Sequence, residues 1–109
     1  MPDDAEKLAI TLMTEWGLIA KGWTFEYDMP SKRFGLCDYR RKKISINKLL
    51  TCLNEEPEVK ETILHEISHA ICGPHHGHNS YWRKIASAVG CKPTACYGLE
   101  VKQRYQPRG

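Results

Sequence analysis

The residues best suited to chemistry lie in the stretch "HEISHAICGPHHGH", which contains all five histidines of the chain. It begins with the pattern H-E-x-x-H, from His65 to His69. On a helix this four-residue step places both imidazoles on one face, where they can share a zinc ion. Glu66 lies one residue after the first histidine, so its carboxylate would reach a water on the metal rather than the metal itself. The pattern predicts His65 and His69 as zinc ligands and Glu66 as a general base.

A catalytic zinc site requires a third protein ligand and one open position for water. His75, His76 and His78 can all be reached after a turn at Gly73-Pro74, and spacing alone does not choose among them. We select His78 because it directly precedes the last expected helix, whose packing would fix it. We expect His75 and His76 to be exposed loop residues.

The expected reaction follows from this set of residues. Zinc would lower the pKa of a water, and Glu66 would take its proton, so that the water could attack a polarised carbonyl. The oxyanion formed in this attack needs a further donor, for which Tyr81, Tyr97 or an arginine are alternatives.

The helix that carries the motif has clear boundary signals. Asn54-Glu55-Glu56-Pro57 combines a capping residue, acidic residues and a proline suited to a first turn. Gly73-Pro74 ends the apolar periodicity near Cys72. We therefore expect a helix over 55–72, with His65, Glu66 and His69 in its second half.

The other elements predict an α+β domain. A first helix would be capped by Asp3 or Asp4 and end at Gly17 or Gly22, and a last helix would cover 79–89. Alternating aromatic residues predict a strand over 23–28, and two further strands fit 33–39 and 43–47. We expect these three strands to form a small antiparallel sheet. Residues 1–101 would form a single domain, followed by a polar tail over 102–109.

Length and composition fit one intracellular domain. The chain has 109 residues, 41% hydrophobic and 27% charged, and no apolar run approaches the roughly 20 residues of a spanning helix. The N-terminus has acidic residues where a secretory signal would have basic ones. Five cysteines without a C-x-x-C pair do not suit a disulfide framework or a cysteine zinc site. We expect a cytoplasmic monomer without a membrane partner.

Positive charge is concentrated in one segment. Residues 31–48 carry seven basic residues against Asp38, a net +6 in a chain of net +3, which leaves −3 for the remainder. This segment predicts a hairpin with a cationic tip that could contact DNA. The alternative is a solvated hairpin whose charge only maintains solubility. The candidate nucleic-acid-binding residues are Lys32, Arg33, Arg40, Arg41, Lys42 and Lys43.

With these residues identified, the chain resembles the SprT-like zinc metallopeptidases, the group that includes bacterial SprT proteins and the protease domain of Spartan. The resemblance covers about 33–96 and is carried by "RFGLCDYRRKKISINKLL", "PEVKETILHEISHA" and "GHNSYWRKIASAVG". It implies a minimal zincin-like fold, His78 as third ligand, Trp82 as the aromatic residue after it, and Glu66 as the base. Many members have a small residue where this chain has Asn79. A terminal zinc ribbon would need two cysteine pairs, and only Cys91 and Cys96 remain there.

Two functions are compatible with these features. The first is a zinc-dependent endopeptidase with one zinc ion that cleaves proteins, including proteins associated with nucleic acid. The alternative is a non-catalytic module in which zinc is structural and the domain binds nucleic acid or regulates a partner. Glu66 favours the first, because a structural site does not need a carboxylate directed at a water.

Overall fold

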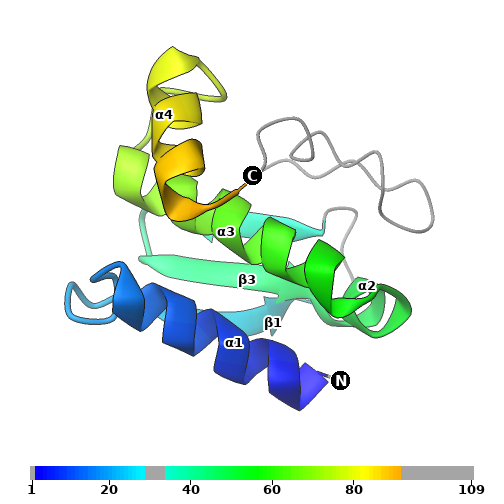
Figure 1. The fold of residues 1–109 in the computed structure, drawn as a ribbon. Helices are drawn as coiled ribbons and strands as arrows, with labels where there is room; N and C mark the ends of the chain where they lie inside the picture. Colours follow the sequence, from blue (N-terminus) through cyan, green and yellow to red (C-terminus); the bar gives the residue numbers. More distant parts are fainter. Residues whose placement is uncertain (1, 29–33, 92–109) are drawn as a thin grey trace.

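The computed structural model describes residues 2–28 and 34–91, so the expected tail over 102–109 lies outside the described residues. Seven elements follow one another along the chain (Figure 1). They are α1 (Pro2–Glu15), β1 (Thr24–Asp28), β2 (Gly35–Asp38), β3 (Lys43–Asn47), α2 (Lys48–Leu53), α3 (Glu56–Cys72) and α4 (Ser80–Val89). The α+β fold class is confirmed.

The sheet has the strand order β1-β3-β2 and is mixed. β2 and β3 form the expected antiparallel hairpin, whereas β1 runs parallel to β3. The prediction of a fully antiparallel sheet was therefore wrong. It assumed that strands adjacent in sequence pair in order, but β3 lies between the other two. Two reversals of chain direction separate β1 from β3, which makes this pair parallel.

The central position suits the sequence of β3. Ile44 and Ile46 are fully buried on one face, and Ser45 and Asn47 are buried on the other. A strand paired along both edges can satisfy its backbone while it is covered in this way. β1 is half-exposed, which suits an edge strand with alternating polar residues.

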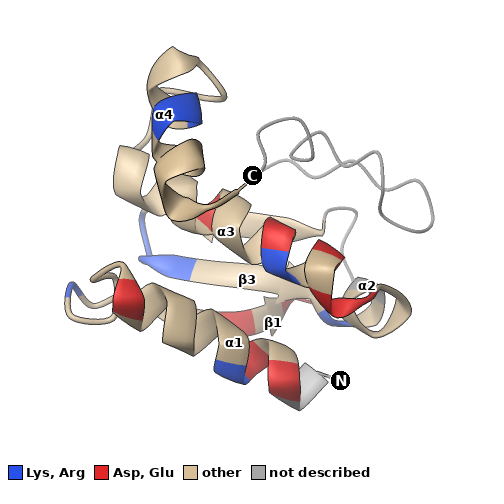
Figure 2. Cartoon of the chain, viewed as in Figure 1, with Lys and Arg blue, Asp and Glu red and all other residues tan. Residues whose placement is uncertain are grey.

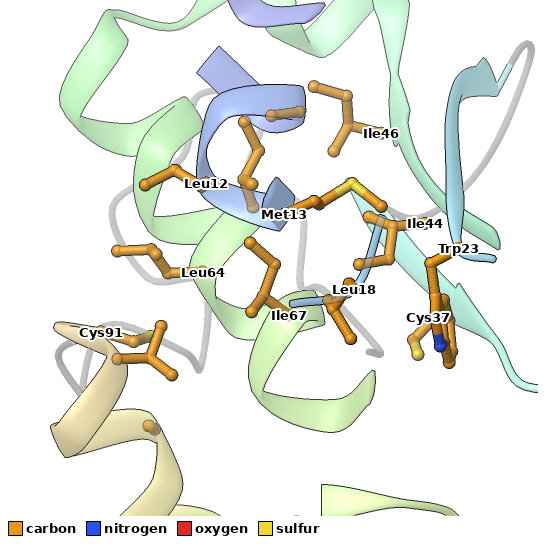
Figure 3. Close-up of a cluster of buried hydrophobic side chains, with 14 of the residues drawn as sticks. Leu12, Met13, Leu18, Trp23, Cys37, Ile44, Ile46, Leu64, Ile67 and Cys91 are labelled. Carbon is orange, nitrogen blue, oxygen red and sulfur yellow. The ribbon is translucent and has the colours of Figure 1, made fainter. Parts of the chain in front are cut away.

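The helices α1 and α3 contact each other and pack against the sheet, with α3 beside β2 and β3 (Figure 1). α4 packs against α3 near its C-terminal end. Side chains from α1, α3 and β3 meet in one apolar cluster, in which Met13, Ile67 and Ile44 face one another (Figure 3). This cluster fixes the direction of α3 and therefore also the direction of the side chains on the opposite surface of the helix.

Several boundaries differ from the expected ones. α1 starts at Pro2, so Asp3 and Asp4 lie within its first turn rather than before it, and it ends at Glu15. β2 is shorter than the predicted 33–39, and α2 was not predicted. Among the described residues, no helix is both long enough and apolar enough to cross a membrane.

Candidate metal centre

The ends of α3 are set by local sequence, but the N-cap is Glu55 rather than the expected Asn54, and the helix begins at Glu56. The Glu55 N–H donates to the Glu58 carboxylate at 3.1 Å in a capping box. Pro57 occupies the first turn. At the other end Gly73 adopts a φ of 94°, and its N–H donates to the His69 carbonyl at 2.9 Å. A positive φ of this kind favours glycine, and it turns the chain back toward the helix.

Three histidines converge at this turn. The Nε2 atoms of His65 and His69 are 3.2 Å apart, and Nε2 of His78 lies 3.1 Å from each of them. His65 and His69 come from α3, and His78 comes from the loop before α4. The three together could bind one metal ion.

Hydrogen bonding among the histidines cannot explain this triangle. An imidazole nitrogen is either a donor or an acceptor in a given tautomer, never both. Among three mutually close nitrogens, at least two must therefore be of the same kind and repel each other. A cation that accepts a lone pair from all three nitrogens removes this conflict.

Burial adjusts the histidines for such a role. His65 and His69 are buried and His78 is half-buried. Burial, followed by the neighbouring histidines, lowers the pKa of His65 well below its usual value, and burial and His78 lower the pKa of His69 to about 4. Burial, followed by Arg83, also lowers the pKa of His78. All three rings are thus neutral near pH 7, the form that binds metal.

The loop and α4 hold His78 in place. Asn79 is the N-cap of α4, and its side-chain oxygen accepts a hydrogen bond from the Trp82 N–H at 3.1 Å. An asparagine at this position is thus explained by its role as the N-cap. The Trp82 indole is buried, and its ring lies 4.7–5.2 Å from those of all three histidines. Trp82 thus packs against the whole histidine triad.

Glu66 follows His65 on α3, and its side chain is directed at β2. It is fully buried, and it contacts β2 at Gly35. Burial, followed by the charge of Glu66, raises the pKa of the Cys37 thiol. Burial also raises the pKa of Tyr39, with a smaller effect from Glu66. The carboxylate therefore faces a strand surface whose titratable groups stay neutral.

The remaining histidines lie outside the triad, as expected, but only His75 is exposed, whereas His76 is half-buried. His75 is exposed and has a φ of 78°. His76 stacks against Tyr81 at a ring distance of 4.8 Å, and its Nδ1 lies 3.2 Å from the Asn79 amide nitrogen. Tyr81 is half-exposed in this stack. Tyr97, the other tyrosine considered as an oxyanion donor, lies outside the described residues.

The basic residues divide into separate groups. Arg40, Arg41 and Lys42 are exposed in the turn between β2 and β3, which Asp38 holds by accepting a hydrogen bond from the Arg41 N–H at 3.1 Å. Lys43 instead forms an ion pair with Glu26 at 3.0 Å. Figure 2 shows basic residues at the start of β3 and again on α4. Lys32 and Arg33 lie outside the described residues.

Sequence reasoning missed three contacts around the site. The resemblance implied Trp82 only as the aromatic residue after His78, and its contact with every histidine of the triad was not foreseen. The Tyr39 hydroxyl donates to the His69 carbonyl at 3.1 Å. Gly35 approaches Glu66 closely. Helical spacing from His78 to Trp82 could have indicated the first contact, whereas nothing in the sequence signals the other two.

Comparison with known proteins agrees with this geometry. A comparison with curated proteins finds no match. The family model of the SprT-like family matches residues 11–104, a range that includes the histidine triad, Glu66 and Trp82. This family is associated with metallopeptidase-like domains. Because the match covers most of the described residues and far more than half of the chain, the chain belongs to the SprT-like family.

Proposed function

We propose that this protein is a zinc-dependent endopeptidase that hydrolyses peptide bonds. The observation that carries the proposal is the convergence of three neutral histidine nitrogens, with the buried Glu66 directly after His65 in α3. Family membership supports it independently.

The donor set fits zinc. A tetrahedral zinc ion with bonds of about 2.0–2.1 Å to nitrogen places its ligands roughly 3.3 Å apart. The three Nε2 atoms are separated by 3.1–3.2 Å, close to this spacing. Three histidines also leave a fourth position for water or substrate, as in catalytic rather than structural zinc sites.

Each residue has a distinct role in this proposal. His65, His69 and His78 would hold the ion. When bound, zinc supplies a Lewis acid that polarises a carbonyl and lowers the pKa of a nearby water. The Glu66 carboxylate would accept a proton from the attacking water and return it to the departing amine. Trp82 would keep the three ligand rings from turning away.

Glu66→Gln tests the catalytic role directly. Glutamine has nearly the same shape but cannot accept the proton, so we expect kcat to fall by at least about 10²–10⁴-fold. Zinc content, measured by mass spectrometry of the purified protein, should stay at the wild-type value. Cleavage of an unfolded protein substrate provides the activity. Wild-type cleavage by the Gln variant would rule out the peptidase proposal.

We also propose that the turn at Arg40-Arg41-Lys42 contacts nucleic acid and brings the enzyme to nucleic-acid-associated proteins. Its three side chains are exposed and of one sign. Replacing Arg40 and Arg41 with Ala should weaken binding of single-stranded DNA. It should also make the fall of log affinity with log salt less steep, by roughly 0.7 in slope for each lost phosphate contact. A fluorescence titration at several salt concentrations measures both quantities.

Lys7→Ala provides a control for the loss of one exposed positive charge elsewhere, on α1. It should leave the salt slope unchanged. If the double arginine variant bound DNA with the wild-type affinity and slope, the turn would have no role in binding.

A further inference from the structure

Gly35 differs from every other glycine for which the structure gives surroundings. A Cβ atom built on Gly35 would lie 2.9 Å from Glu66 Oε2 and 3.1 Å from Glu66 Cγ. Real Cβ atoms essentially never approach other atoms that closely. The glycines with positive φ meet nothing within 4 Å of such an atom, and they are Gly17, Gly22, Gly73, Gly77 and Gly90. Those five glycines are suited to a backbone conformation with positive φ. Gly35 is instead required because there is no room for a side chain at its position.

We propose that Gly35 is a positioning residue for Glu66, an inference that rests on the proposed peptidase function. Because Gly35 has no side chain, β2 can lie directly against the glutamate and fix where its carboxylate points. Any side chain here would occupy the space that Glu66 now fills. Gly35 itself does not touch the reacting atoms, so its effect is exerted through Glu66.

The surroundings predict which atoms move when a methyl group is added. The new Cβ would also lie 2.9 Å from Thr62 Cγ2. Thr62 is β-branched, and its hydroxyl donates to the Glu58 carbonyl at 3.1 Å, which fixes its rotamer on α3. The Glu66 carboxylate is the end of a longer, more flexible side chain. The steric overlap should therefore be relieved mainly by movement of Glu66. We expect this movement to reduce activity more than stability.

The rest of this strand face supports the same role. Gly35 and Cys37 are both buried and face α3, since side chains two residues apart share one face of a strand. Cys37 stays a neutral thiol near Glu66 because burial raises its pKa. The face of β2 that carries Gly35 and Cys37 thus packs closely around the Glu66 carboxylate and adds no charge of its own beside it.

Gly35→Ala is the first part of the test. A displacement of about 1 Å can reduce a rate by about 10²-fold, so we expect a decrease in kcat of that order with little change in KM. Zinc content should remain at the wild-type value, and the melting temperature should fall by only a few degrees. Unchanged kcat in this variant would overturn the inference, as would a loss of activity explained by lost zinc or unfolding.

Thr62→Ser separates the two contacts of the added methyl group. Serine keeps the hydroxyl but removes Cγ2, and the single variant should have wild-type activity. In the double variant Gly35→Ala, Thr62→Ser, we expect kcat to stay low, because the contact of the added methyl group with Glu66 remains. Full recovery of kcat would show that the methyl group acts through Thr62, and it would overturn the role of Gly35 toward Glu66.

A stability measurement on metal-free protein adds a readout that does not depend on activity. Gly35→Ala should lower the urea midpoint of the wild type but lower it much less in a Glu66→Ala background, where the methyl group has room. Equal shifts in both backgrounds would contradict the contact. If Glu66→Gln left cleavage intact, the peptidase proposal would fail, whereas wild-type kcat in Gly35→Ala alone would remove only the inference about Gly35.

Discussion

At the scale of single residues, the site depends on where each histidine originates. His65 and His69 are one helical turn apart on α3, so the helix alone brings them together. His78 reaches them through a loop and depends on the packing of Trp82. The third ligand is therefore the one whose position is set by tertiary contacts.

Loss of this ligand should be visible in metal binding. Loss of a group that only hydrogen-bonds to a metal ligand lowers metal affinity by about 10–100-fold. We expect His78→Ala to lower the affinity for zinc by more than this. Zinc per protein after dialysis should fall from near one to well below one. His75→Ala is the matched control, because His75 is exposed in the same loop. Equal zinc loss in both variants would contradict the assignment of His78.

At the scale of elements, α3 and α4 divide the work of building the site. α3 is defined by its capping box and carries two of the proposed ligands, His65 and His69, and Glu66. α4 carries none of these groups, but its start lies directly after His78 and its Trp82 covers the triad. The N-terminus of α4 thus couples helix formation to the position of one ligand.

Asn79→Ala should test this coupling. Removal of an N-cap side chain costs about 1 kcal/mol of stability. We expect a decrease of that size in the free energy of unfolding, from urea titration of the zinc-bound protein, together with weaker zinc binding in competition with a chelator. Ser80→Ala, one residue further on, should change neither. Unaltered zinc affinity in Asn79→Ala would mean that the cap stabilises α4 without holding His78.

At the scale of the whole molecule, the candidate metal centre is joined to the hydrophobic core through Trp82. The apolar cluster joins residues of α1, β3, α3 and α4, among them Met13, Ile44, Ile67 and Trp82. Folding of this domain therefore has a source of stability other than the metal. This favours the proposed catalytic role over a structural zinc module, whose folding would depend on its metal.

Chelation should accordingly leave the domain folded. After zinc removal we expect most of the helical circular dichroism to persist, with a lower melting temperature because a bound ligand stabilises only the native state. Loosening should be confined to the His78 loop and α4, as measured by hydrogen exchange. Global unfolding on chelation would instead support a structural zinc ion.

The sequence by itself determined the features that depend on local spacing. The helix over α3, its end at Gly73, the pairing of His65 with His69 and the hairpin between β2 and β3 all follow from periodicity, capping and turn residues. These interactions join residues a few positions apart, so a linear pattern can specify them. The choice of His78 also rested on such a pattern, namely its place just before a helix.

Only the tertiary structure decided the features that depend on distant contacts. The parallel pairing of β1 with β3 reflects which strand occupies the buried centre of the sheet. The pairing of Lys43 with Glu26 follows from that register and removes one residue from the expected basic surface. Gly35 meets Glu66 only because β2 lies on α3, and a glycine looks the same in sequence whether it serves a turn or a close approach. Such packing joins residues about 17 to 31 positions apart, which local propensities do not encode.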